Sequence, residues 1–310
     1  MFKFNNLKKV AMCGTLCFTS FAYADLNTVV SIVPQKTFVK AIGGDKVDVS
    51  LMVKPGNSPH SYEPKPSQMK DISKADLYFA IDVEFEQAWL PKFKKQNIDM
   101  KIVDLSDGIH KLKMEKHSHD EEDHDDDHHG HYEDKHHEEH EDHAEHDKHE
   151  GLDPHIWTSP SNVKIIAKNI YKALVKNDPS NKNYYEANYE KFLEHIRETD
   201  KKIKRILIDV DTGSKFMVFH PAWGYFANDY GLKQIAIEAG GKNPKPKQLA
   251  HLIEEAKEEK IKAVFTAPEF SDKAAKQIAK EVSVPVIKVS PLNPKWSQNL
   301  QRLAKAISNK

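Results

Sequence analysis

The sequence predicts an α/β protein in which two similar parallel-sheet lobes are joined by one long rigid helix, with a metal site in the cleft between the lobes. Three observations lead to this prediction. Short β-like runs alternate with amphipathic helical runs in both halves of the 310-residue chain, which is typical of parallel sheets covered on both faces. A glycine-free stretch of helical periodicity, 179–208, separates the two halves. Histidines stand in proline-stiffened turns, two of them directly after predicted strands.

In the first half the alternation gives four strands and three helices. The glycines at 43–44 are a helix-stop signal that ends the first helix. The predicted strands are 28–33, 47–53, 76–81 and 101–105. The predicted helices are 37–42, 67–75 and 84–95.

The same alternation returns after residue 210. It again gives four strands, here with four helices. Gly231 ends the first of these helices. The predicted strands are 215–219, 234–238, 263–266 and 284–289. The predicted helices are 222–230, 246–259, 271–281 and 295–307.

The connection between the halves is predicted to be a single helix, 179–208. It begins with Asp-Pro-Ser-Asn, a helix-start signal, and contains no glycine or internal proline. Nearly 30 residues of helix would span about 42–45 Å. Two helices broken near Glu198 are the alternative. The expected N-terminal lobe is 25–178 and the expected C-terminal lobe 209–310.

Residues 1–24 are predicted to be a cleavable signal peptide. A basic start precedes the apolar run 10–22, and Ala22-Tyr23-Ala24 is a small-x-small cleavage site. A membrane anchor is the alternative, but the apolar run falls short of the ~20 residues that a spanning helix needs. We therefore expect an exported, periplasmic protein.

Both cysteines, Cys13 and Cys17, lie in this segment. A lipoprotein is disfavoured because Leu16 precedes Cys17 where a small residue would be needed. The mature chain would contain no cysteine, which excludes disulfides, cysteine-bound zinc and a cysteine nucleophile.

Residues 117–150 are predicted to form a disordered loop inserted in the first lobe. They contain sixteen acidic residues, two lysines and twelve histidines, and such a segment has too little apolar surface to fold alone. The acidic residues of this loop offset the excess of basic residues elsewhere, so the whole chain has a net charge of −1. We expect it to collect metal weakly; a solvated insertion with incidental affinity is the alternative.

Three histidines outside the loop flank prolines in turns: His60, His155 and His220. Ligands of open parallel sheets bind beyond the carboxyl ends of the strands, so these side chains can converge across a cleft. Imidazole suits Zn, Cu, Fe and Ni, and three imidazoles leave a fourth tetrahedral position open. The remaining histidines outside the loop are expected at the surface: His110, His195 and His251.

Three segments carry a resemblance to a known family: PGNSPHSYEPKPSQM around His60, DPHIWTSP around His155 and FMVFHPAWGYFANDYGL around His220. Together with the acidic histidine-rich loop they resemble the metal-binding motifs of the cluster A-I solute-binding proteins of ABC transporters. The zinc-specific, ZnuA-like branch is the closest fit, and the resemblance covers essentially the whole mature chain. It implies that the three histidines bind one Zn²⁺ as transported ligand.

The resemblance leaves the fourth ligand open. Manganese-selective relatives tend to place a carboxylate where this chain has His220, and imidazole there favours Zn²⁺. They also place Asp where this chain has Ser290, and some zinc-binding members have Glu where it has Pro59. Our hypothesis is a three-histidine site completed by water, a loop histidine or an acid such as Glu269.

The predicted function is capture of extracytoplasmic Zn²⁺ and its delivery to an ABC-transporter permease with a cytoplasmic ATPase. We expect a monomer that is not an enzyme. A binding protein for manganese or another divalent metal is the first alternative, and a metal buffer acting only through the loop is another. A three-histidine zinc hydrolase is disfavoured because the chain has no His-Glu-x-x-His motif and no evident general base. Nucleic-acid binding is unsupported because the basic residues are dispersed.

Overall fold

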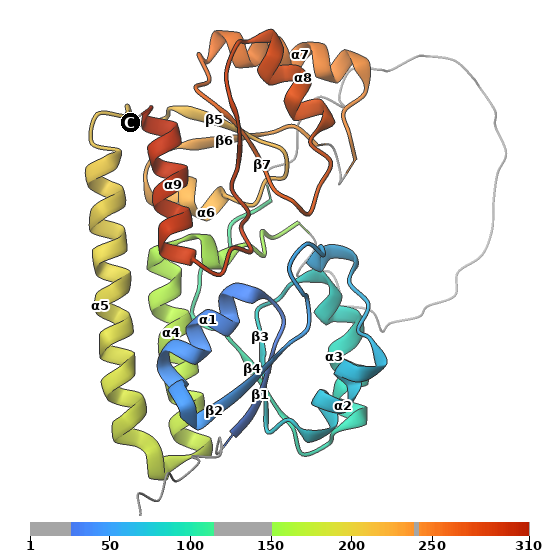
Figure 1. Ribbon diagram of the computed structural model, residues 1–310, viewed down its shortest axis with the longest axis vertical. Coiled ribbons are helices and arrows are strands. Elements are labelled where there is room, and N and C mark those ends of the chain that lie inside the picture. Colours follow the sequence, from blue (N-terminus) through green and yellow to red (C-terminus); the bar gives the residue numbers. More distant parts are fainter. Residues whose placement is uncertain (1–25, 115–150, 239–241, 310) are drawn as a thin grey trace, which may run out of the picture.

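The computed structural model describes residues 26–114, 151–238 and 242–309, which form two α/β lobes, one above the other in Figure 1. The predicted signal peptide, with both cysteines, and the predicted loop 117–150 lie outside the described residues. In the part of the chain that is described, no helix has the length and apolar character of a membrane span.

The N-terminal lobe contains a four-stranded sheet in which every pairing is parallel. Its strands are β1 (Leu26–Val30), β2 (Val47–Leu51), β3 (Leu77–Ala80) and β4 (Lys101–Asp104). Its helices are α1 (Val33–Gly43), α2 (Pro66–Lys74) and α3 (Glu84–Gln96). The strand order is β2-β1-β3-β4, with Thr28 of β1 opposite Val49 and Leu77. β3 is buried throughout, as expected for a central strand covered on both faces.

The C-terminal lobe repeats this arrangement with the parallel order β6-β5-β7-β8. Its strands are β5 (Lys215–Val218), β6 (Lys233–Ala236), β7 (Val264–Thr266) and β8 (Val286–Lys288). Its helices are α6 (Gly224–Asp229), α7 (Pro246–Glu258), α8 (Lys273–Glu281) and α9 (Trp296–Ser308). The prediction of two parallel-sheet lobes is therefore confirmed.

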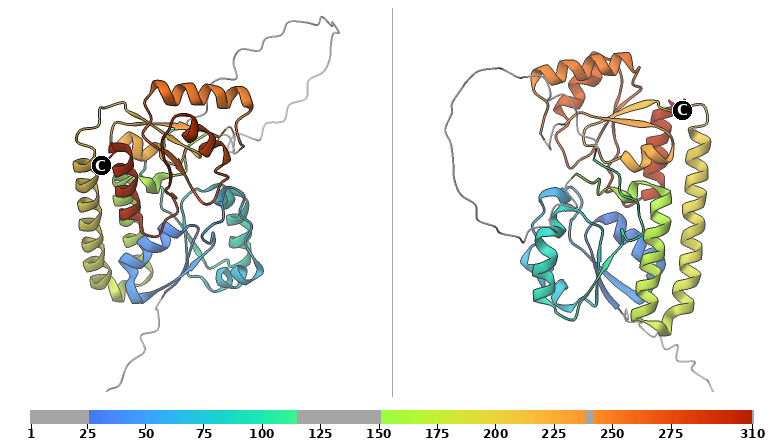
Figure 2. Two further views of the ribbon diagram at one scale, coloured as in Figure 1. Left: turned by 45° about the horizontal axis from the view of Figure 1, so that its top comes forward. Right: turned by 180° about the vertical axis from the view of Figure 1, so that it is seen from behind.

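The connection between the lobes is one unbroken helix, α5 (Lys182–Ile206). It continues through Glu198, so the alternative of two broken helices is wrong. A second long helix, α4 (Pro160–Asn177), precedes it. The two lie side by side in Figure 1 and in the right-hand view of Figure 2. Tyr171 of α4 stacks on Tyr189 of α5, with ring centroids 4.8 Å apart. This stacked pair is one of the contacts that pack α4 against α5.

The final helix, α9, binds the two lobes together. Trp296 at its start packs edge-on against Phe38 of α1, with ring centroids 5.6 Å apart, and its indole donates a hydrogen bond to the carbonyl of Trp157. One hydrophobic cluster therefore runs from the N-terminal lobe through α5 and α9 to one face of the C-terminal sheet. A second cluster lies between the other face of that sheet and α7 and α8.

The predicted bounds fail most clearly at the first strand and helix. We expected a strand over 28–33 and a helix over 37–42, but α1 begins at Val33. Pro34 lies in the first turn of this helix, where its missing N–H costs no intrahelical hydrogen bond. The chain thus changes from strand to helix within three residues after Val30.

Candidate metal centre

His60 lies in the turn that follows β2. This turn contains a short 3₁₀ helix, Pro59–Ser61, whose first residue is a buried proline. The hydroxyl of Ser58 caps it by accepting from the backbone N–H of His60 at 3.3 Å. Proline at a helix start is pre-organised for the turn, so the local sequence holds the imidazole at the carboxyl-end edge of the N-terminal sheet.

His155 lies between a β-bridge and another short 3₁₀ helix, Ile156–Thr158. It is 2% exposed. Asp153, two residues earlier, accepts hydrogen bonds from both the backbone N–H and the Nδ1–H of His155, at 2.9 and 2.7 Å. One carboxylate oxygen therefore fixes both the backbone and the ring of this histidine.

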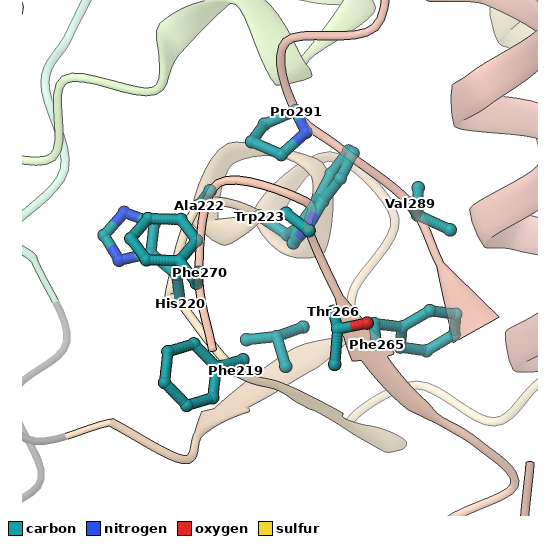
Figure 3. A pocket seen from close by; sticks show the side chains of 11 residues that line it. Phe219, His220, Ala222, Trp223, Phe265, Thr266, Phe270, Val289 and Pro291 are labelled. Atoms are coloured by element: carbon teal, nitrogen blue, oxygen red, sulfur yellow. The ribbon is translucent and has the colours of Figure 1, made fainter. Parts of the chain in front are cut away.

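His220 comes from the C-terminal lobe, two residues after the end of β5. Phe219 before it still pairs with the neighbouring strands, through bonds from its N–H to the carbonyl of Phe265 and from the N–H of Glu238 to its carbonyl. Phe270 lies against the imidazole, with ring centroids 4.5 Å apart and planes 23° apart (Figure 3). Sheet hydrogen bonds thus hold the backbone next to His220, and Phe270 packs against its ring.

The structure brings these three predicted histidines together between the lobes. His60 Nε2 lies 2.9 Å from His220 Nε2, and His220 Nε2 lies 3.2 Å from His155 Nε2. The ligand nitrogens of all three lie within 4.8 Å of one another. Two nitrogens on one tetrahedral zinc ion would be ~3.3 Å apart, given Zn–N distances of ~2.0–2.1 Å. The spacing therefore fits a single zinc ion with little movement.

Each of the three histidines also has a carboxylate at its other ring nitrogen. Glu84 Oε1 lies 2.7 Å from His60 Nδ1, and Glu238 Oε1 lies 2.8 Å from His220 Nδ1. Asp153 does the same for His155. A carboxylate at Nδ1 keeps the proton there and leaves the Nε2 lone pair for a metal.

This arrangement suits a cation and is unfavourable without one. Three Nε2 lone pairs face one another at short range, and three carboxylates stand behind them. Glu84 Oε2 and Glu238 Oε2 are buried and have no hydrogen-bond partner among the described residues. A divalent cation between the nitrogens would relieve the repulsion and offset the negative charge behind the rings.

The pKa shifts of His220 and Glu84 have different causes. Burial lowers the pKa of His220 to about 4; the bond to Glu238 opposes this shift, and the neighbouring imidazoles add to it. His220 is therefore neutral near pH 7 and can bind a metal without first losing a proton. Burial alone would raise the pKa of Glu84, but the hydrogen bond and charge of His60 lower it below its ordinary value.

Glu269 is one of the fourth ligands that the sequence suggests. Glu269 lines the same cavity as the three histidines, but its oxygens are not among the ligand atoms that lie within 4.8 Å of one another. Ser290 donates its hydroxyl to Glu269 Oε1 at 2.9 Å. Burial raises the pKa of Glu269 above its ordinary value.

The other histidines of the described residues stay away from this cluster. His195 is exposed on α5, where its ring lies parallel to that of Phe192. His110 and His251 are also exposed. Their predicted surface positions are confirmed.

The three carboxylates behind the histidines were not predicted from the sequence. A signal for two of them was present, since Glu84 and Glu238 each follow the carboxyl end of a strand, β3 and β6, where sites of parallel sheets gather. Asp153 had a weaker signal, its place two residues before His155. None stood out by composition, because the chain contains 47 acidic residues.

Comparisons with known proteins show which proteins this chain resembles. The family described as "ZnuA: Zinc-uptake complex component A periplasmic" matches residues 28–309. The high-affinity zinc uptake system protein ZnuA of Bacillus subtilis (strain 168) is 32% identical over 88% of this chain and 81% of its own. The zinc-binding protein AdcA of Streptococcus pyogenes serotype M3 is 33% identical over 87% of this chain, which spans about half (51%) of that relative. A crystal structure of a ZnuA is 38% identical and superimposes with a TM-score of 0.77 over 92% of this chain and 98% of that one.

Proposed function

Because the chain belongs to the ZnuA family of zinc-uptake components, we propose that it binds Zn²⁺ between its lobes through His60, His155 and His220. It acts as the zinc-binding solute-binding protein of an ABC transporter. The observation that carries the site assignment is the convergence of three Nε2 atoms, each on a ring whose Nδ1 faces a carboxylate. A structural histidine cluster would not need all three lone pairs to face one point.

The ligand set favours zinc over manganese. Manganese prefers hard oxygen ligands, whereas imidazole nitrogen suits zinc. All three converging ligand atoms here are imidazole nitrogens. We therefore expect manganese to bind far more weakly than zinc. A zinc–manganese competition on the purified protein tests the alternative of a manganese-binding protein.

Delivery of the metal requires that the site open. His60 and His155 belong to the N-terminal lobe and His220 to the C-terminal lobe, so separating the lobes removes one ligand from the other two. The shared core along α5 and α9 resists a wide hinge motion. A displacement of His220 by a few ångströms is sufficient, because a Zn–N bond needs a separation of ~2.0–2.1 Å.

The remaining parts of the proposal concern export and partners. Residues 1–24 act as a signal peptide that directs the protein to the periplasm, and a membrane permease with its cytoplasmic ATPase receives the zinc. The protein works as a monomer without covalent chemistry. Residues 117–150, with twelve histidines, collect zinc weakly and are not needed for the tight site.

Competition titration tests the proposal. Zinc is added to the purified protein in the presence of a strong chromophoric chelator, for the wild type and for His220→Ala. We expect one tight site, weakened by at least about 100-fold in the variant, since loss of a ligand exceeds the 10–100-fold typical for loss of an outer partner. His195→Ala is the matched control, because it removes an exposed histidine of α5. A His220→Ala protein that binds zinc as tightly as the wild type would place the site elsewhere.

A further inference from the structure

Among the described residues, Glu269 is the only acidic residue that lines the cavity of the three histidines. It lies in the turn after β7, at the carboxyl-end edge of the C-terminal sheet. The next residue, Phe270, stacks on His220. The position of Glu269 is therefore tied to the position of a metal ligand.

One oxygen of this carboxylate is held and the other is free. Ser290 donates its hydroxyl to Oε1 at 2.9 Å, and the same hydroxyl oxygen accepts from the N–H of Leu292 at 3.0 Å. Oε2 is buried and has no hydrogen-bond partner among the described residues. A buried carboxylate oxygen without a partner is costly, so a hydrogen-bond donor in the cavity would stabilise it.

Glu269 lines the cavity but does not belong to the group of converging ligand atoms. Ligand atoms of one tetrahedral zinc ion are ~3.3 Å apart. The oxygens of Glu269 do not meet the 4.8 Å limit that the three histidine nitrogens meet. A water molecule bound to the metal would supply the donor that Oε2 lacks.

We propose that Glu269 holds the fourth zinc ligand, a water molecule, by accepting its hydrogen bond at Oε2, while Ser290 anchors Oε1. This assignment rests on the proposed zinc site. It makes Glu269 a positioning residue that completes the site in place of the carboxylates absent at Pro59 and Ser290. The role is electrostatic as well as geometric, because the carboxylate favours the more positive, zinc-loaded state.

Glu269→Gln tests the assignment, since it keeps the shape of the side chain and removes its charge. Zinc affinity is measured by chelator competition for the wild type, Glu269→Gln and the control Glu63→Gln, which removes an exposed carboxylate three residues from His60. We expect a 10–100-fold loss of affinity in Glu269→Gln, the range for outer partners of a metal site, and no change in Glu63→Gln. Ser290→Ala should lose less, because it frees Oε1 but keeps the charge.

A second measurement separates a held water from direct ligation. One equivalent of Co²⁺ replaces zinc, and azide is added while the visible spectrum is recorded, with His220→Ala reporting cobalt held elsewhere. We expect azide to displace the water and change the spectrum of the wild type, and to bind more tightly to Glu269→Gln. A wild-type spectrum insensitive to azide, with a response only in Glu269→Gln, would mean that Glu269 is itself a ligand and would overturn the proposal.

The two proposals fail in different ways. Unchanged zinc affinity in Glu269→Gln, with one tight site that His220→Ala still abolishes, would refute the role of Glu269 alone. The absence of any tight site in the wild type would refute the zinc site itself, and the role of Glu269 with it.

Discussion

Replacing Glu86 with glutamine should change how the stability of the metal-free protein depends on pH. Glu86 lies in the first turn of α3 and is 2% exposed. Its Oε2 accepts from the backbone N–H groups of Ile81 and Asp82 at 3.1 and 2.7 Å. Asp82 has a φ of 65°, so this carboxyl group holds the strained turn that leads to Glu84 and hence to His60.

The sign of the effect follows from the pKa of Glu86. Burial raises this pKa from 4.5 to about 8, and the bonds from Ser31, Ile81 and Asp82 oppose the shift. Between these two values the folded state binds a proton that the unfolded state has lost. The free energy of unfolding therefore falls as pH rises through this window.

The contribution of Glu86 to the free energy of unfolding is best measured above pH 6.5. His220, whose pKa is lowered to about 4, acts in the opposite sense, because its contribution rises with pH between about 4 and its unfolded value of 6.5. Between pH 6.5 and 8, only Glu86 of these two residues still changes its contribution to the free energy of unfolding. At ~1.36 kcal/mol per pH unit it amounts to about 2 kcal/mol.

Urea unfolding followed by tryptophan fluorescence, with a chelator present, measures this difference at pH 6.5 and 8. Glu86→Gln is neutral at every pH and can still accept from the Asp82 N–H. The stability of the wild type should fall by about 2 kcal/mol relative to the variant over this interval. An equal change in the free energy of unfolding of wild type and variant between pH 6.5 and 8 would refute the reasoning. It would show that Glu86 is ionised in the folded state and stabilised by the two backbone N–H groups.

Three further substitutions test how the site is supported. Gly224→Ala would place a Cβ 2.7 Å from Asp153 Oδ2. The resulting shift of that carboxylate should weaken zinc binding in chelator competition. An unchanged affinity would show that the start of α6 moves instead. Glu238→Gln keeps an acceptor for His220 Nδ1 but removes the charge behind the ring, so we expect zinc affinity to fall 10–100-fold, and wild-type affinity would contradict this. Asp229 accepts hydrogen bonds from two serine hydroxyls at the start of α4. Asp229→Ala should therefore lower the free energy of unfolding by about 1–3 kcal/mol with zinc stoichiometry unchanged. A loss of zinc binding would mean that this contact between the lobes also shapes the site.

Most elements of the fold could be predicted because their signals are local. The strands are short runs of β-branched and aromatic residues, and α5 has neither glycine nor internal proline over its length. Boundaries were less predictable, as at Val33, where proline chemistry rather than periodicity sets the helix start. The docking of α9 against α1 and α5 had no local signal, because it depends on which surfaces remain uncovered once both sheets have formed.

The three proposed metal ligands could be identified from the sequence alone. Each of these histidines stands beside a proline in a turn: His60, His155 and His220. The neighbouring residues alone therefore indicate an imidazole held in a rigid turn. Which carboxylates contact these histidines depends on the folded structure. Glu84 and Glu238 lie far along the chain from the rings that they support, and Glu269 is anchored by Ser290 from another strand end. Such contacts arise from the convergence of strand ends in a folded sheet, so composition and spacing do not reveal them.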